Sequence, residues 1–317
     1  MLINQDFTHD RTKYLGGSDI GAILGLSPYK TPVDVWLEKT GKHSHQIDNL
    51  PIRFGTFAES FVASEYARAT GSILREYPQA ITHPHHPYLQ GHIDRFVSPD
   101  PCLALFNENG SCTASHLLEC KTASPYTQSQ WGEAGSDEVP MSYLAQCHWY
   151  LCMTGLERCD LAVLFGNSDF RIYQIDRDEA LESALLEAAL TFWQDHVLKD
   201  IPPEAKTISD YQKLFAKEVP GKTLEATEQT MLLIEAAKQM NTEIDTKEQE
   251  LEQIKKSLMD QMQEAQELTY QGKVLATWKK PKASFRFDSK RFEIEHPELY
   301  PQFQTPIQNS RRFVIKT

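Results

Sequence analysis

Apolar side chains recur every three or four residues along several stretches of the first 200 residues, which is the spacing of an amphipathic helix. The clearest stretch, 53–70, places three phenylalanines and an alanine on one face, and we expect that face to be buried. These residues are Phe54, Phe57, Ala58 and Phe61. In total the pattern predicts helices over 20–24, 31–41, 53–70, 143–154 and 178–198.

Short runs of apolar, β-branched and aromatic residues between these helices predict strands. Residues 160–165 and 170–175 flank a Gly-Asn pair, which is typical of a hairpin turn. Two further strands are predicted over 88–97 and 116–122. Helices that enclose a central sheet indicate an α/β core.

The pattern changes after residue 200, where Ile201-Pro202-Pro203 indicates a boundary. We therefore predict a core over 1–200, a linker over 201–222 and a C-terminal extension over 223–317. In the extension, apolar residues at alternating steps of three and four predict a coiled-coil-like helix, which serves as a hairpin arm or an oligomer contact. Its seam consists of Ala237, Met240, Ile244, Leu251, Ile254, Leu258, Ala265 and Leu268, interrupted by Lys247 and Gln261.

The end of the extension is predicted to hold a small β structure and a local excess of positive charge. A hairpin is expected at Gln271-Gly272, followed by a basic strand over 279–287 and a short helix over 288–295. Residues 270–317 hold 10 basic and 4 acidic side chains, whereas the whole chain carries a net charge of −12. A local basic surface can bind phosphates although the whole molecule repels them, but a solvated basic strand is an equally good interpretation.

Bulk composition excludes several function classes. The chain has 40% hydrophobic and 24% charged residues, and no apolar stretch approaches the roughly 20 residues of a membrane-spanning helix. Residues 1–13 contain no signal-peptide core, so we expect a cytoplasmic protein without a membrane role. The six cysteines include no Cys-x-x-Cys pair and are interpreted as reduced thiols, with an iron–sulfur cluster as the minor alternative.

Candidate chemistry centres on the strand predicted over 116–122. Strand alternation places Glu119 and Lys121 on one face, while the residues between them point to the other. Asp94 ends or crosses a neighbouring strand and presents a second carboxylate. Two converging carboxylates bind a hard divalent cation such as Mg²⁺, which can activate a water molecule as a nucleophile. Lys121 would then orient or deprotonate that water.

Each of these residues also has an ordinary interpretation. A Glu-x-Lys pair on an exposed strand is usually a surface ion pair. An aspartate after a strand is usually a turn residue. Glu59 lies at the edge of the apolar face of the helix over 53–70, where a solvated side chain is the default. The residues gain catalytic meaning only in combination.

Five separated blocks place these residues in a wider pattern: Leu15-Gly16-Gly17-Ser18-Asp19-Ile20 with Ser27-Pro28-Tyr29-Lys30, Arg53-Phe54-Gly55 followed by Glu59, Asp94, Glu119-Cys120-Lys121, and Tyr143-x-x-Gln146 with Thr154-Gly155. In this order the blocks resemble the lambda-exonuclease or YqaJ-like group of phage recombination nucleases. The resemblance runs through most of the first 200 residues. It implies a restriction-endonuclease-like α/β core, with a central mixed sheet flanked by helices.

The resemblance also implies a two-metal hydrolysis of phosphodiester bonds. Asp94 and Glu119 would hold one Mg²⁺, with Mn²⁺ as an alternative ion, and the carbonyl of Cys120 would be a further ligand. Glu59 would complete a second metal site.

Two more functions are implied by the resemblance alone. Gln146 matches a helix residue that supports the nucleophilic water or Lys121, although a half-buried polar seam would also place it there. Arg11 and Ser18 match a pocket for the 5′-phosphate of a DNA end, and a helix N-terminus suits an anion. Their ordinary interpretation is a surface arginine and a plain helix cap.

Members of this family digest linear double-stranded DNA from 5′ to 3′ and leave 3′ single-stranded tails for recombination. The resemblance therefore implies a homotrimer that encloses the duplex, a phage-type single-strand annealing protein as partner, and the cytoplasm of a bacterial host. Two alternatives stay open. One is an endonuclease or cluster-bearing DNA-processing nuclease of the same fold, and the other is a non-catalytic DNA-binding or scaffold protein.

Overall fold

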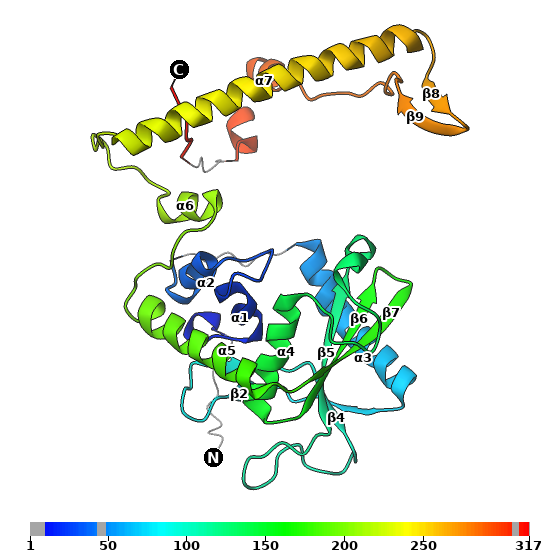
Figure 1. The fold of residues 1–317 in the computed structure, drawn as a ribbon, viewed down its shortest axis with the longest axis vertical. Helices are drawn as coiled ribbons and strands as arrows, with labels where there is room; N and C mark the ends of the chain where they lie inside the picture. Colours follow the sequence, from blue (N-terminus) through cyan, green and yellow to red (C-terminus); the bar gives the residue numbers. More distant parts are fainter. Residues whose placement is uncertain (1–9, 43–48, 306–310, 317) are drawn as a thin grey trace. The chain divides into compact units, whose positions relative to one another are not determined.

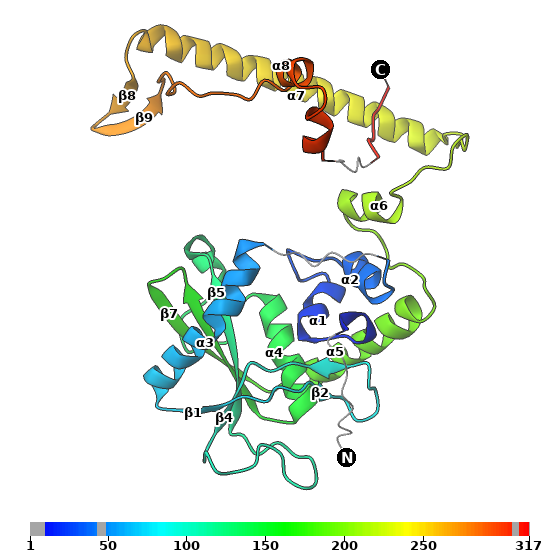
Figure 2. The same ribbon diagram turned by 180° about the vertical axis from the view of Figure 1, so that it is seen from behind.

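A computed structural model describes residues 10–42, 49–305 and 311–316. Residues 1–9, which belong to the segment without a predicted signal peptide, lie outside this range. The chain divides into two compact units, Met1–Leu214 and Phe215–Thr317. Figures 1 and 2 show both units from opposite sides. In the described part of the chain, no helix has the length and apolar character needed to cross a membrane.

The strands of the first unit form one five-stranded sheet in the order β1-β4-β5-β6-β7. Strands β5 and β6 run parallel, whereas the other neighbours are antiparallel, so the sheet is mixed. The predicted α/β core with a central mixed sheet flanked by helices is therefore confirmed. The strands are β1 (Ile73–Arg75), β4 (Arg95–Ser98), β5 (His116–Ala123), β6 (Arg158–Phe165) and β7 (Asp169–Asp176).

The stretch predicted as one strand over 88–97 is divided into two by a bend. Its first part, β3 (Gln90–Gly91), pairs with β2 (Ile81–Thr82) in a separate small sheet. Its second part is β4 of the main sheet. Asp94 lies in the bend between them, at the point where the chain enters the main sheet.

Helices cover both faces of the main sheet (Figures 1 and 2). Helix α3 (Leu50–Thr70) packs on the face that carries Leu118 and Cys120 of β5. Helix α4 (Met141–Thr154) packs on the other face, with α1 (Gly17–Ile23) and α5 (Glu179–Phe192) against it. The predicted helices are present, and α5 continues into a π-helical turn over Trp193–Val197.

The predicted buried face of α3 is wrong. Phe54, Phe57 and Phe61 are 45%, 80% and 53% exposed, and of that predicted face only Ala58 is buried. The face of α3 that contacts the sheet is a neighbouring one. Two of its residues are alanines, and their small side chains let the helix approach the strands closely. This buried row consists of Ala58, Val62, Ala63 and Tyr66.

Two shorter helices join the first unit. Helix α2 (Pro32–Lys39) is opened by Thr31, whose side chain accepts a hydrogen bond from the backbone N–H of Asp34. Helix α6 (Ile208–Leu214) lies within the segment predicted as a linker. It belongs to the first unit, because the Oγ of Thr31 donates to Asp210 at 2.6 Å.

The second unit contains α7 (Glu228–Met262), the hairpin β8 (Glu267–Tyr270) and β9 (Lys273–Thr277), and α8 (Ser289–Glu295). The predicted long helix, small β structure and short helix are thus confirmed. The helix is shorter than predicted, because α7 ends at Met262 and the last two residues of the predicted seam, Ala265 and Leu268, lie beyond it. The strand predicted over 279–287 is wrong, since these residues have no regular structure. Pro281 is the third residue of this segment and cannot donate a hydrogen bond to a neighbouring strand.

Candidate active site

The first two carboxylates of the candidate site meet where the bend before β4 faces β5. Arg95 pairs with Leu118 across the two strands, which places Asp94 beside Glu119. The backbone N–H of Cys120 donates to Oδ2 of Asp94 at 2.9 Å and fixes the position of that carboxylate. Strand alternation places Glu119 on the face opposite to Leu118 and Cys120, as predicted, and this face is the one that α4 covers.

Glu119 is 1% exposed and receives two hydrogen bonds on one of its oxygens. Lys121 Nζ donates to Oε1 at 2.5 Å, and Nε2 of Gln146 donates to the same atom at 2.7 Å. The other oxygen, Oε2, is buried without a hydrogen-bond partner among the described residues. A buried carboxylate oxygen without a donor is unfavourable, so this atom needs a positively charged or protonated partner.

The pKa values of Glu119 and Asp94 also indicate that the site has too little positive charge for two ionised carboxylates. Burial raises the pKa of Glu119 to about 8, and the nearby charge of Asp94 raises it further against the opposing effect of Lys121. Burial also raises the pKa of Asp94. Burial alone would lower the pKa of Lys121, but Glu119 and Asp94 outweigh it, so that pKa lies above its ordinary value and the amine is protonated.

These residues fit a divalent cation. The buried carboxylate of Glu119 and the half-buried one of Asp94, both with raised pKa values, and one unpartnered oxygen supply the hard oxygen ligands that Mg²⁺ prefers. The side chains alone make a site of two carboxylates, because no group of three or more His, Cys, Asp or Glu residues in the described ranges is arranged to hold a metal ion. Further ligands would come from the backbone, the substrate or water.

Glu59 lies at the border of this group rather than inside it. Its Oε1 accepts a hydrogen bond from Nη1 of Arg95 at 2.8 Å, and the same guanidinium binds Glu76 at 3.0 Å. Its helix, α3, covers the face of the sheet opposite to the one on which Glu119 lies. The Glu59 carboxylate is close enough to Asp94 to raise the pKa of that residue, but a cation already neutralises it.

Tyr150 also belongs to the site, and its role was not predicted from the sequence. Nε2 of Gln146 donates to the Tyr150 hydroxyl at 2.8 Å as well as to Glu119. The tyrosine ring lies directly against two glycines. A Cβ atom on Gly17 would approach the ring to 2.6 Å, and one on Gly91 would approach it to 3.2 Å. Alanine at position 17 would therefore collide with the Tyr150 ring, whereas at position 91 the ring would have to give by a few tenths of an ångström. The four-residue spacing of Tyr150 from Gln146 is the signal in the sequence.

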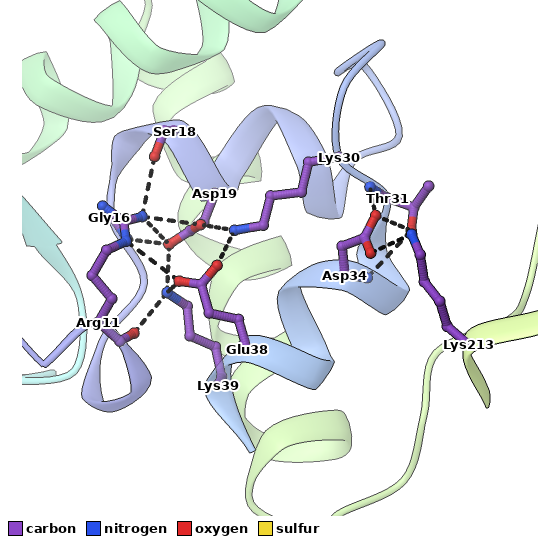
Figure 3. A network of polar contacts seen from close by, with 10 residues as sticks. All are labelled: Arg11, Gly16, Ser18, Asp19, Lys30, Thr31, Asp34, Glu38, Lys39 and Lys213. Atoms are coloured by element: carbon purple, nitrogen blue, oxygen red, sulfur yellow. Dashed lines mark hydrogen bonds and ion pairs between the residues drawn. The ribbon is translucent and has the colours of Figure 1, made fainter. Parts of the chain in front are cut away.

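A second group of charges surrounds Asp19, which is fully buried (Figure 3). Lys30 and Lys39 bind its two oxygens at 2.8 and 2.9 Å, and Nη2 of Arg11 lies 3.3 Å from both. Nη2 of Arg11 also donates to the Oγ of Ser18 at 3.2 Å, so these two predicted residues lie together. We call the charged residues the Asp19 cluster: Arg11, Asp19, Lys30, Glu38 and Lys39.

The Asp19 cluster has its charges satisfied. Burial alone would raise the pKa of Asp19, but Lys39, Lys30 and Arg11 outweigh it and hold that pKa far below the ordinary value. Three cations and two carboxylates leave one positive charge, and Arg11 is 47% exposed in its side chain. The roles of Lys30, Glu38 and Lys39 were not predicted, because their significance depends on a contact with Asp19 that spacing along the chain does not reveal.

A family model described as a YqaJ-like viral recombinase domain matches residues 6–157. This range contains every residue of the candidate site. The chain carries a YqaJ-like viral recombinase domain. The family predicted from the five sequence blocks is therefore confirmed.

One similarity to a known protein extends beyond this domain. The chain is 28% identical over 314 residues to the uncharacterized protein YqaJ of Bacillus subtilis strain 168, and the match covers 97% of this chain and 92% of that protein. It is 24% identical over 159 residues to the uncharacterized protein R354 of Acanthamoeba polyphaga mimivirus, covering 50% and 28%. A solved structure of an alkaline exonuclease, LHK-Exo from Laribacter hongkongensis, is 17% identical with a TM-score of 0.47, covering 60% of this chain and 91% of that one.

Proposed function

We propose that this protein is a metal-dependent exonuclease that degrades linear double-stranded DNA from 5′ to 3′ and leaves 3′ tails for homologous recombination. The observation that carries the proposal is the Asp94–Glu119 pair, in which the buried Glu119 has one oxygen without a partner among the described residues and has Lys121 and Gln146 beside it. The YqaJ-like viral recombinase domain supports the role in recombination.

Asp94, Glu119 and the carbonyl of Cys120 would hold Mg²⁺, with Mn²⁺ as an alternative ion. When bound, such an ion polarises a phosphate and lowers the pKa of a water molecule. Gln146 keeps the Glu119 carboxylate in place through Oε1 and leaves Oε2 for the ion. Loss of the proton from Glu119 then allows that carboxylate to act as a ligand.

Lys121 has two conceivable roles, and its environment favours one of them. A lysine that deprotonates water must lose its own proton near neutral pH, but the pKa of Lys121 is raised by Glu119 and Asp94. Its Nζ atom is therefore a hydrogen-bond donor. We propose that Lys121 orients the attacking water and stabilises the negative charge that develops on the phosphate oxygens.

Glu59 is proposed as the ligand of a second cation in a two-metal form of the site. Nη1 of Arg95 now donates a hydrogen bond to Oε1 of Glu59 at 2.8 Å, so the carboxylate would have to give up this contact to bind the ion. The released guanidinium keeps Glu76 as its partner.

Arg11 and Ser18 are proposed to bind the 5′-phosphate of the DNA end. The Asp19 cluster supports this role, because it carries one net positive charge and presents the Arg11 guanidinium and the Ser18 hydroxyl side by side. Asp19 and Glu38 hold the guanidinium in one orientation.

We further propose a homotrimer around the duplex and a phage-type single-strand annealing protein as partner. The apolar seam of α7 supports self-association, since Met240, Ile244, Leu251 and Ile254 are about half exposed or more. Sedimentation at micromolar concentration tests the trimer. A monomer or dimer would contradict it.

The nuclease proposal is tested with linear duplexes labelled at either 5′ or 3′ end, beside a covalently closed circle. We expect Mg²⁺-dependent release of mononucleotides from the 5′ end, no cutting of the circle, and no activity in Lys121→Ala. Rapid cutting of the circle would indicate an endonuclease of the same fold. The absence of any metal-dependent hydrolysis would indicate a non-catalytic DNA-binding or scaffold protein.

A further inference from the structure

Positive charge is concentrated in residues 278–287 of the second unit, which follow β9 directly. We call this stretch the basic aromatic segment. It holds four basic and no acidic residues, whereas α7 in the same unit holds four basic and eight acidic ones. Lys279 forms an ion pair with Glu267 at 2.5 Å. The other three cations form no hydrogen bond or ion pair with any residue that the structure describes, so they are available to an anionic partner. They are Lys280, Lys282 and Arg286.

The large apolar side chains of the basic aromatic segment are aromatic and reach the solvent. Phe285 is fully exposed, Phe287 is 68% exposed and Trp278 is 46% exposed. The Phe287 ring contacts the Phe292 ring of α8, with ring centres 5.2 Å apart. The rings of Trp278 and Phe285 make no ring contact within the described part of the chain. A partner with flat rings would therefore cover apolar surface that is now in contact with water.

The backbone of the basic aromatic segment restricts the kind of partner. Residues 278–287 have no regular secondary structure and leave β9 as coil (Figure 1). Pro281 lacks the N–H group that a helix or a central strand needs. A protein that reads duplex DNA inserts a helix or a β-ribbon into a groove, and a basic segment that lies on a membrane usually forms an amphipathic helix. This segment forms neither of these structures.

We propose that the basic aromatic segment binds single-stranded DNA, with its unpaired cations on the phosphates and its aromatic rings stacked on unpaired bases. A single strand offers a flat base and a phosphate at every nucleotide, so such binding requires no particular sequence. The strand is the 3′ tail that digestion leaves, and this assignment rests on the proposed nuclease function. Because the whole chain carries a net charge of −12, the binding is local and weakens steeply with salt.

Binding of a labelled oligothymidylate to the full chain tests the cations. Fluorescence anisotropy is measured with EDTA present, so that no hydrolysis occurs. A triple glutamine variant of Lys280, Lys282 and Arg286 should bind about tenfold more weakly than the wild type. The slope of log K against log salt concentration should become shallower by about two, because each phosphate contact on a single strand contributes about 0.7.

The matched control for the cations is a triple glutamine variant in α7, which changes the net charge by the same amount. It replaces Lys238, Lys255 and Lys256, which are exposed. This variant should bind like the wild type. Equal weakening in both triple variants would overturn the proposal, since it would indicate a general effect of net charge. The absence of binding by the wild type would overturn it as well.

Phe285→Leu tests the stacking, because leucine keeps an apolar side chain but has no flat face. This variant should bind oligothymidylate about tenfold more weakly than the wild type and bind an abasic strand of the same length equally well. Tyr270→Leu on the hairpin is the control, because Tyr270 is 64% exposed and lies outside the segment. Weakening of Phe285→Leu on the abasic strand or on a blunt duplex to the same extent would contradict binding to unpaired bases.

Two further outcomes separate this proposal from others. If the variants bind oligothymidylate like the wild type but no longer sediment with phosphatidylserine vesicles, the segment binds a membrane and the proposal is wrong. The anisotropy measurement requires neither metal nor hydrolysis. A protein without hydrolytic activity that shows the expected binding differences would therefore contradict the nuclease proposal alone, whereas an active nuclease without these differences would contradict the present proposal alone.

Discussion

The protein contains two groups of charged residues, each around one buried carboxylate, and the two carboxylates differ in the direction of their pKa shifts. Asp19 lies among Arg11, Lys30 and Lys39, and its pKa is lowered far below the ordinary value. Glu119 has Lys121 as its cation and Asp94 as a neighbouring anion, and its pKa is raised to about 8. Both carboxylates are almost completely removed from water, so burial alone does not explain the difference.

The difference follows from the number of cations that each carboxylate contacts. Around Asp19 the attraction of three cations exceeds the cost of burial, and the group is complete within the protein. Around Glu119 one lysine is insufficient, and Oε2 has no partner among the described residues. The carboxylate of Asp19, whose charge is neutralised within the protein, stabilises the fold and holds Arg11 in place. The carboxylate of Glu119, whose charge is only partly neutralised, is the one that an added cation would stabilise most.

The largest expected effect comes from Glu119→Gln. This change should lower Mg²⁺-dependent hydrolysis about a thousandfold, or about 4 kcal/mol, because the amide is a poor ligand for the ion. Without metal the variant should be at least as stable as the wild type in urea, since a neutral side chain removes the charge that burial disfavours.

The metal dependence of stability provides the control. Mg²⁺ should raise the melting temperature of the wild type and leave that of Glu119→Gln unchanged. A variant that is unfolded without metal would show that Glu119 has a structural role like that of Asp19.

Asp19→Asn should have the opposite profile. Removing the charge leaves Lys39, whose side chain is 0% exposed, with Glu38 as its one anionic partner among the described residues, and we expect a loss of about 3 kcal/mol in the free energy of unfolding. Because the folded pKa of Asp19 is depressed, its contribution is present above the ordinary pKa of about 4 and is lost as pH falls below it.

Urea titrations between pH 7 and pH 3 measure both effects. The wild type should lose stability more steeply than Asp19→Asn on the acid side. Glu187→Gln is the control, because Glu187 is an exposed residue of α5 in the same unit and its loss should leave both the stability and its pH dependence unchanged. If the wild type and Asp19→Asn lose stability equally steeply as the pH falls, the pKa of Asp19 is not lowered by its three cations and the interpretation of the Asp19 cluster is wrong.

The two groups also differ in how far the sequence could predict them. Glu119 and Lys121 lie two residues apart on one strand, so alternation alone places them together. Asp94 could be added because a strand signal ends near it. The Asp19 cluster joins residues from three separate stretches, and neither their spacing nor their charge indicates that they meet.

Errors in the predicted fold have local physical causes. The row of phenylalanines on α3 has helical spacing, but spacing does not distinguish a buried row from a neighbouring exposed one. The sheet contacts the face of α3 that contains Ala58 and Ala63, because their small side chains let the helix backbone come closest to the strands. The strand over 279–287 was predicted from its composition, yet Pro281 removes a hydrogen-bond donor that a strand needs.

Gly17→Ala tests the connection between the two groups. The added Cβ would lie 2.6 Å from the Tyr150 ring, and we expect a loss of about 2 kcal/mol in stability as the ring is displaced. Since Tyr150 holds Gln146, hydrolysis should fall together with stability. Gly16→Ala is the matched control, because its Cβ meets only the Tyr14 ring at 3.5 Å, and wild-type behaviour is expected there.

The smallest expected effect is that of Glu59→Gln. The electrostatic state of Glu59 is intermediate between those of Asp19 and Glu119. Its carboxylate is near the incomplete pair but already has Arg95 as a cation, so we expect a loss of about tenfold in kcat, or about 1.4 kcal/mol. Mg²⁺ titrations of the rate should show a weaker requirement for the second ion and an unchanged requirement for the first. A loss as large as that of Glu119→Gln would place Glu59 with the incomplete carboxylates in spite of its contact with Arg95. An unchanged rate together with an unchanged metal requirement would contradict the proposed role of Glu59 at the second ion.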